Sequence, residues 1–341
     1  MLEIVRQEAE ELCLLSFLTA RGVLARGLIA RSVIARSVVA IAASAIFLVG
    51  SAASAALDAE DQPSIRIRLV DHAKLQLRLI QLYQSRSEMD GADLIASETI
   101  LRPSLRVPYA KWGEIDLSTR YDVRHYDFDG RSNLVDDEIS PGTPFKSLNA
   151  YRVRLGTNIR LSEKLYWSTG AISRAKWESG ADVGDAMRLG GFMAVGLQPV
   201  PRIFIGIGVG VKKRLHGGDL HFGPLWRIQW RILDRVDLLV ENLTSRIRID
   251  LNRQFQLQLI AKLEERTYQL RDRGGNHATE FEERKVPVRL RLVWRANDHY
   301  RVEFDLGAYF EQRLRTDAAD THQSIDQGTT VFVGVGVRFR N

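Results

Sequence analysis

The chain has very little cysteine: Cys13 is the single one among 341 residues. One cysteine excludes a disulfide scaffold and any zinc or iron–sulfur site built from several cysteines. The sequence also lacks a run of about 18–20 uncharged apolar residues, which excludes a helical protein that crosses a membrane repeatedly. A charged fraction of 26% and a hydrophobic fraction of 45% are ordinary for a folded protein, so wholesale disorder is excluded too.

Acidic residues are missing between Ala20 and Leu57, where the chain has the order of a secretory signal peptide. Four arginines there each begin a five-residue unit: Arg21, Arg26, Arg31 and Arg36. An uncharged apolar run of 13 residues, Val38 to Gly50, follows and leads to small residues around Ala55. We predict cleavage after Ala55, so that residues 1–55 are a signal peptide with an extended basic N-terminal region. The mature domain, residues 56–341, then has no cysteine.

The alternative for this segment is an uncleaved amphipathic helix that lies on a membrane surface. A five-residue period scatters the arginines around a helix and leaves no polar face, which favours the signal peptide. Cys13 precedes the apolar run, so it is not a lipid-attachment site.

Beyond Gln62 apolar and polar residues alternate with a period of two, which is typical of β-strands. In Tyr151–Leu161, for example, Arg152 and Arg154 alternate with apolar residues. In Val302–Glu311 we expect Glu303, Asp305 and Glu311 on the polar face. Further alternating stretches are Ile203–Val211, Trp226–Ile232, Phe255–Glu264 and Val288–Trp294. Helical periodicity competes only in Asp71–Ser87.

Turn signals separate these stretches and imply antiparallel pairing of neighbouring strands. They include Asp129-Gly130, Ser140–Gly142, Gly217-Gly218, Asn252-Arg253 and Arg273–Asn276. We predict about 12 strands, within about 10–14, because Leu233–Leu251 is compatible with one strand or two. Long polar interruptions at Gly130–Lys146 and Asp317–Gln327 are expected to be loops on one rim.

Alternation alone fits a soluble sandwich or a membrane barrel, since each has one apolar face per strand. The stretches are long enough to cross a bilayer, and full charges in the middle of strands suit a hydrated lumen. Aromatic residues near the ends of apolar faces suggest an interfacial girdle. They are Tyr109, Trp112, Tyr151, Trp226 and Trp294. These features favour an all-β, antiparallel up-and-down transmembrane β-barrel over a soluble secreted β-sandwich or lipocalin-like binder.

The C-terminal stretch Val331–Phe339 is an alternating strand that ends on an aromatic residue. It resembles the terminal signal by which outer-membrane barrels are recognised for assembly, except that Arg340 and Asn341 follow the aromatic residue. Together with the signal peptide, it predicts location in the outer membrane. The expected partners are outer-membrane lipid and, through this strand, the barrel-assembly machinery; the oligomeric state stays open.

Three stretches resemble an uncharacterised family of predicted bacterial outer-membrane β-barrel proteins. They are Phe222–Trp230, with a Gly-Pro that enters a Trp-containing strand, Arg246–Arg253, and Phe255–Leu270, which ends in Tyr268-Gln-Leu. The resemblance implies a barrel fold and an outer-membrane location. It implies no particular activity.

No motif of an enzyme is present: the sequence has no nucleophile elbow, phosphate-binding loop or His-Glu-x-x-His helix. The alternative of a barrel hydrolase would rest on Asp219 with His221 or Asp298 with His299, near turns. A carboxylate pair, Asp136 and Asp137, and the spacing of His216 and His221 are weaker candidates. We therefore expect no enzyme, no catalytic residues, no cofactor and no metal.

The arginines on the polar faces have two interpretations. They would bias a pore towards anions, or they would be neutralised by pairs such as Arg289 and Arg291 with Glu303 and Asp305. A pI of about 9.5 is a reason to consider nucleic-acid binding. The arginines are dispersed along the chain, however, so we expect no nucleic acid as a partner. We favour internal pairing and predict a narrow or occluded lumen, in a passive structural barrel or narrow pore.

Overall fold

The computed structural model describes residues 69–89, 92–130, 147–215, 219–271, 280–317 and 322–341. All of them belong to one compact unit, Ala53–Asn341. The predicted signal peptide lies outside the described residues, and so do Asp136, Asp137 and His216 and most of the loop Gly130–Lys146.

Alternating sequence folds into long strands, as predicted. The first eight are β1 (Lys74–Met89), β2 (Ala92–Ala110), β3 (Gly113–Gly130), β4 (Ser147–Arg160), β5 (Leu165–Glu178), β6 (Arg188–Val200), β7 (Ile203–Arg214) and β8 (His221–Leu233). The others are β9 (Val236–Glu241), β10 (Thr244–Asp250), β11 (Phe255–Lys262), β12 (Glu264–Gln269), β13 (Glu280–Arg295), β14 (Tyr300–Asp317), β15 (His322–Gln327) and β16 (Thr330–Arg340). A short helix, α3 (Val183–Ala186), joins β5 to β6.

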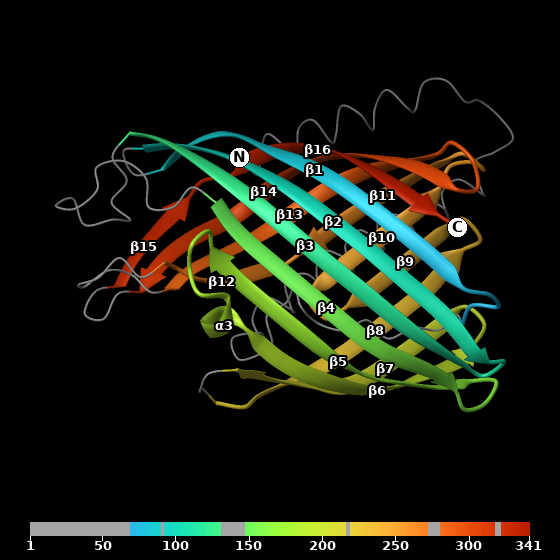
Figure 1. Cartoon of the computed structure of the whole chain (residues 1–341). Coiled ribbons are helices and arrows are strands. Elements are labelled where there is room, and N and C mark those ends of the chain that lie inside the picture. The colour runs from blue at the N-terminus through green and yellow to red at the C-terminus, as the bar shows by residue number, and fades with distance from the viewer. Residues whose placement is uncertain (1–68, 90–91, 131–146, 216–218, 272–279, 318–321) are drawn as a thin grey trace, which may run out of the picture. The chain divides into compact units, whose positions relative to one another are not determined.

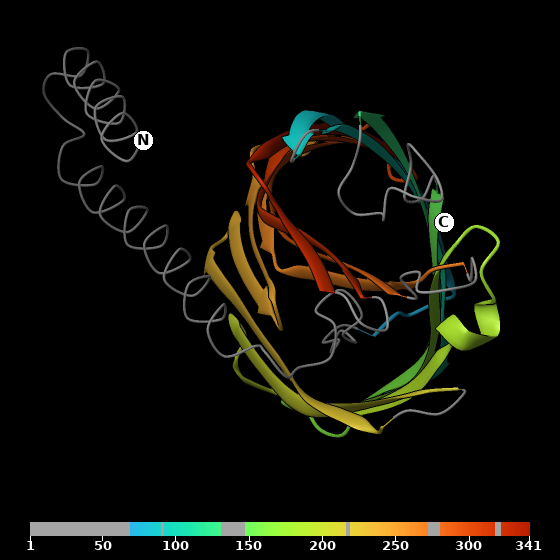
Figure 2. The ribbon, with the colours of Figure 1, turned by 90° about the vertical axis from the view of Figure 1, so that its left-hand side faces the viewer.

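The strands form one antiparallel sheet that closes on itself (Figures 1 and 2). Pairing of β1 with β16, β16 with β14, and β14 with β13 completes a wall of 14 strands, in which β12 prolongs β11 and β15 flanks β14. The predicted class is confirmed, but the count of about 12 was too low, partly because Leu233–Leu251 holds both β9 and β10. The helix considered for Asp71–Ser87 was wrong, because Lys74–Met89 is a strand that pairs on both sides.

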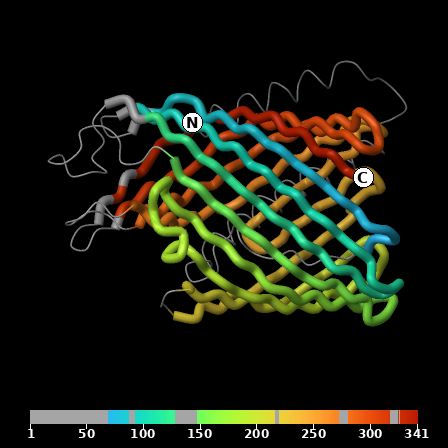
Figure 3. The backbone as a smooth tube through the Cα atoms, viewed as in Figure 1, coloured from blue at the N-terminus to red at the C-terminus, as the bar shows by residue number. Residues whose placement is uncertain are grey.

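The two ends of the barrel differ. At one end, here called the turn end, short connections join neighbouring strands, β1 begins and β16 finishes (Figure 3). The opposite end, the loop end, has the longer connections, such as the segment with α3 between β5 and β6. The interruption predicted at Asp317–Gln327 lies at this end and contains β15.

The outer face carries an apolar belt. On β16, Val331, Val333, Val335 and Val337 are each between 47% and 50% exposed. Aromatic residues lie outside at the turn end, where Tyr109 and Trp112 pack edge to face and Trp294 is 41% exposed. Tyr151 and Trp226 lie farther along their strands. An exposed apolar surface of this extent suits contact with lipid rather than water. None of the described helices is long and apolar enough to cross a membrane.

The wall is lower at β9 and β10 than elsewhere. Their hairpin ends at Asn242, whose backbone has φ of 50°, a left-handed conformation that asparagine tolerates. Asn242 N donates to the carbonyl of Trp226, and its side-chain oxygen accepts from Trp226 N. Beyond this point β12 bends across the interior and meets β5 through one parallel bridge, Gln269 with Trp177 (Figure 2).

A bulge in β14 changes one predicted face. Arg284 faces Arg313, but Val286 faces Phe310, so β14 has one extra residue there. Glu311 adopts φ of 49° and is exposed, and Gln312 is buried in the interior instead. The expectation that Glu311 shares a face with Glu303 and Asp305 was therefore wrong, because a bulge reverses the alternation.

Candidate functional site

The inner face of the barrel carries a continuous row of arginines. Directly opposed residues on antiparallel strands share one face of the sheet. The register places Arg78 opposite both Arg338 and Arg102, and Arg152 opposite both Arg120 and Arg174. Arg102 faces Arg120 in the register set by the adjoining pairs Leu101–Tyr121 and Ser104–Ser118. The register of the next strands on both sides continues the row, which then contains one arginine on each of ten neighbouring strands.

We call this row the arginine ladder. In order of strands it consists of Arg295, Arg301, Arg338, Arg78, Arg102, Arg120, Arg152, Arg174, Arg188 and Arg214. Arg295 is the last residue of β13, at the turn end, whereas Arg188 begins β6 and Arg214 finishes β7, at the loop end. The strands are tilted (Figure 3), so the row set by their register runs along the wall from one end of the barrel to the other.

Four middle residues of the ladder line a cavity of about 240 Å³ in the lumen, here called the chamber. Its cationic lining comprises Arg78, Arg102, Arg120, Arg152, Arg246, Lys262, Arg289 and Arg291. Two carboxylates, Glu241 and Glu264, and three aliphatic residues, Ile80, Leu239 and Ile260, complete the charged and apolar lining. Cations thus outnumber carboxylates in the lining itself, although carboxylates behind it pair with some of them, as Asp122 does with Arg120 at 2.7 Å.

The predicted internal pairs are present. Arg291 donates to both carboxylate oxygens of Asp305 at 2.6 and 2.7 Å, and it lies 3.1 Å from Glu303. Arg289 lies 3.6 Å from Asp305. These pairs do not balance the charge, because Glu303 is also the partner of Arg78 and Arg338. Three arginines therefore share one carboxylate.

Arg246 differs from the other cations of the chamber. Its guanidinium forms no ion pair with a carboxylate of the described residues, and its buried Nε has no hydrogen-bond partner there. Its direct cross-strand neighbours are Leu239 on β9 and Ile260 on β11, both on the inner face. The strands that carry these three residues, β9–β11, lie across the barrel from β1–β4 (Figure 2).

Between the chamber and the loop end, one side of the lumen is filled by side chains. Glu98 accepts from Arg124 at 2.6 Å and from Arg266 at 3.0 Å. Glu283 accepts from Lys285 at 3.0 Å and also from Arg124. These five side chains are at most 6% exposed and connect β2 and β3 to β12 and β13.

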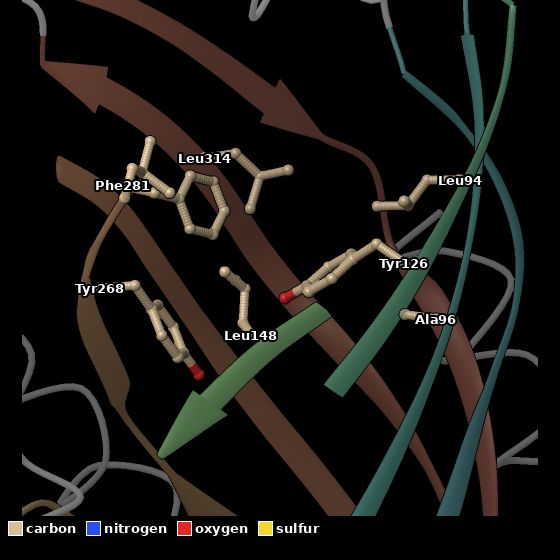
Figure 4. Close-up of a cluster of buried hydrophobic side chains, with 8 residues drawn as sticks. Leu94, Ala96, Tyr126, Leu148, Tyr268, Phe281 and Leu314 are labelled. Carbon is tan, nitrogen blue, oxygen red and sulfur yellow. The ribbon is translucent and has the colours of Figure 1, made fainter. Parts of the chain in front are cut away.

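An apolar layer lies against these ion pairs and comes from the same two sides of the barrel (Figure 4). It consists of Leu94, Ala96, Tyr126, Leu148, Tyr268, Leu270, Phe281 and Leu314. Leu94, Phe281 and Leu314 are fully buried. We call the ion-pair network and this layer together the septum. It supports the predicted narrowing of the lumen.

The wall formed by β4–β7 is built differently. Here aromatic rings lie over inward-facing glycines, since Phe192 covers Gly170 and Phe204 covers Gly196. A Cβ atom on Gly170 would come within 2.7 Å of the Phe192 ring, and one on Gly196 within 2.3 Å of the Phe204 ring. Glycine thus lets the rings lie along the wall rather than project towards the axis.

At the turn end, the chain that precedes β1 reaches the lumen. Val70 N donates at 2.9 Å to Glu114, whose side chain is fully buried. Glu114 also accepts two hydrogen bonds from the Arg106 Nη2 atom, at 2.8 and 2.9 Å, and one from Asn158 at 3.1 Å. A single carboxylate thus fixes the start of β1 to β2, β3 and β4.

The residues considered for hydrolysis do not form a site. Asp219 and His221 are exposed at the loop end, and Asp298 and His299 are exposed at the turn end. His299 Nδ1 lies 3.1 Å from the carbonyl of Arg340, and its ring stacks on Phe339. Within the described part of the chain, no cluster of histidine, cysteine, aspartate and glutamate could hold a metal ion.

Neither the ladder nor the environment of Arg246 was predicted. Alternation places Arg152, Arg289 and Arg291 in the lumen, but it does not align one strand with the next. The signal that was available is modest: nearly every alternating stretch carries arginine at a polar position.

A closed antiparallel wall, an exposed apolar belt and a charged lumen define a barrel of the membrane-spanning type. No family model matches the sequence, and no curated protein is similar to it.

Among solved structures, the chain is similar to the Pseudomonas putida toluene transporter TodX, at 9% identity over 80% of this chain and 90% of that one, with a TM-score of 0.44. It is also similar to an outer-membrane channel from Pseudomonas putida F1, at 9% identity over 82% of this chain and 99% of that one, with a TM-score of 0.43. Similarity to the NanC porin is 13% identity over 77% of this chain and 98% of that one, with a TM-score of 0.37. Likeness at this level concerns the barrel fold and not the solute.

Proposed function

We propose that the protein is an outer-membrane β-barrel that forms a narrow, anion-selective conduit. The arginine ladder is the observation that carries this proposal. Ten arginines on neighbouring strands, ~4.8 Å apart across the sheet, give an anion a sequence of adjacent binding positions from one end of the barrel to the other. Several weak positions favour conduction, because each lets the ion in and out again.

Ladder arginines also pair with carboxylates, as Arg295 does with Asp250 and Arg120 with Asp122, but such pairs do not require arginines in directly opposed positions. Like charges in directly opposed positions destabilise a sheet, so the arrangement has a cost for folding. Lumen water and passing anions reduce that cost, whereas a solid barrel core would increase it. The ladder is therefore better suited to a hydrated passage than to a purely structural barrel.

The route follows the ladder along β4–β7 and bypasses the septum. Flat rings over Gly170 and Gly196 keep this wall thin. Arg174, Arg188 and Arg214 also line a second, small cavity beside α3 at the loop end. Anions would pass from this cavity to the chamber.

Location in the outer membrane rests on the exposed apolar belt and the predicted signal peptide. In this proposal β16, which closes the wall against β1 and β14, is the strand that the barrel-assembly machinery recognises. The full chain should appear in the outer-membrane fraction, require detergent for extraction and shift its electrophoretic mobility on heating. A protein that stays in solution without detergent would contradict this location.

The conduit is tested in planar bilayers with the purified full chain under a tenfold gradient of KCl. We expect a reversal potential on the side of the chloride equilibrium potential. Arg102→Glu and Arg152→Glu, both in the ladder, should move the reversal potential towards that of potassium. Arg202→Glu is the matched control, because Arg202 is exposed at a turn and pairs only with Asp234 among the described residues.

A cation-selective current, or a selectivity that the two ladder variants leave unchanged, would contradict the proposal. Absence of any current step from correctly folded, heat-modifiable protein would leave only a non-conducting barrel.

A further inference from the structure

The lining of the chamber is not uniform, and its asymmetry indicates what kind of anion it suits. Arg78, Arg102, Arg120 and Arg152 line the side formed by β1–β4. The facing side has Arg246 between Leu239 and Ile260, and Ile80 adds a third aliphatic side chain. A purely polar anion would gain nothing from these aliphatic groups, whose burial is favourable only against an apolar surface.

Arg246 is the second observation. The Arg246 guanidinium lines the chamber between two aliphatic cross-strand neighbours and has no carboxylate of the described residues in ion-pair contact. Arginine stacks on flat π-systems, and this contact gains strength where water is excluded. The two aliphatic side chains extend the same surface on both sides.

The size of the chamber sets an upper limit. About 240 Å³ is smaller than the ~300–1,000 Å³ of sites for drug-sized ligands. An oligosaccharide or a lipid chain would not be enclosed, whereas a carboxylate with a single ring fits.

We infer that the chamber binds a small carboxylate with a flat apolar body, which packs on Leu239, Arg246 and Ile260 while the carboxylate faces the arginines of β1–β4. This inference rests on the proposed function and names its preferred solute class. The chamber would then slow such a solute relative to simple inorganic anions, as a binding site within a conduit does.

Equilibrium dialysis with the detergent-solubilised full chain tests the inference, with radiolabelled benzoate as the probe and gluconate as the polar anion of equal charge. We expect saturable binding of benzoate at least tenfold tighter than that of gluconate. Leu239→Asn should weaken benzoate binding by at least fivefold and leave gluconate binding unchanged. Arg246→Gln, which also removes a charge, should weaken benzoate binding by at least fivefold and gluconate binding by less. Arg202→Gln, which repeats the chemical change at an exposed turn, should bind benzoate like the wild type.

Heat-modifiable migration of each variant shows that the barrel has folded, and Leu239→Asn gives a test that removes no charge. Equal affinity for benzoate and gluconate, or wild-type benzoate binding by both chamber variants, would overturn the inference. The proposed function would survive that result as long as the reversal potential stayed anion-selective. Loss of anion selectivity itself would contradict both the proposed function and the inference about the chamber.

Discussion

Two charged regions of the lumen, the septum and the chamber, use the same residue types for different purposes. In the septum, Glu98 and Glu283 each contact at least two cations, and the group is nearly inaccessible to solvent. In the chamber, eight cations and two carboxylates surround a cavity. The septum is filled and nearly inaccessible, whereas the chamber surrounds a cavity, and this difference in burial separates a structural network from a candidate site.

The difference follows from the cost of burying charge. A buried ion needs opposite charge and hydrogen bonds around it, because its desolvation costs several kcal/mol. The septum meets this condition with its own residues and places an apolar layer against them. The chamber has fewer carboxylates on its surface, and several of its cations are paired with carboxylates behind the lining, as Arg120 is with Asp122 and Arg291 with Asp305.

The largest effect is expected in the septum, from Glu98→Gln. This change leaves Arg124 and Arg266 without the carboxylate that they share, and breaking a buried pair in this way costs about 3–5 kcal/mol. The measurement is the urea dependence of unfolding in detergent or lipid. Glu163→Gln, the same change at an exposed turn, is the control. A cost below about 1 kcal/mol, as for an exposed pair, would mean that the septum is not a structural element.

Much of the barrel could be predicted from the sequence, because alternation reports which face of a strand is apolar. The outward set Trp226, Ile228 and Trp230 and the pairing of Arg291 with Asp305 both follow from alternation and from one hairpin. The strand Lys74–Met89 was ambiguous because its apolar residues Leu75, Leu77 and Leu79 run into Ile80 and Leu82, which are buried inside. Because both faces of this strand carry apolar residues, the alternation of apolar and polar residues is lost there.

The ladder could not be predicted, because it depends on the register between strands that are distant in sequence. Arg338 and Arg78 become neighbours only when β16 closes on β1. A shift of one residue in any pair would turn the facing arginine outward. Arg246 was equally hidden, since its special environment comes from Leu239 and Ile260 on two different neighbouring strands.

A smaller effect, in the opposite direction, is expected in the chamber from Arg246→Gln. Because Arg246 has no carboxylate in ion-pair contact among the described residues, its removal relieves desolvation and repulsion from Arg291 and loses only a longer-range attraction to Glu241. Unfolding in urea should show a free energy that is unchanged or raised by up to about 1 kcal/mol. A loss of more than about 2 kcal/mol would show that Arg246 acts like the septum arginines.

The smallest effect is expected outside the lumen, from Arg313→Gln at the loop end. Arg313 and Asp326 form an ion pair at 2.6 Å, with side chains 55% and 71% exposed. The hydrogen bond from Arg313 lowers the pKa of Asp326. The pair therefore stabilises the folded state at pH values above the ordinary pKa of aspartate. This stabilisation is lost as the pH falls through the lowered pKa.

Solvent screens a pair this exposed, so the urea midpoint of Arg313→Gln should be indistinguishable from that of the wild type at pH 7 and at pH 3. The comparison with Glu98→Gln is then between ion pairs of similar length that differ in burial. A midpoint shift as large as that of Glu98→Gln would mean that burial is not the variable that distinguishes them, and the division of the charged lumen into a structural septum and a solvated chamber would lose its physical basis.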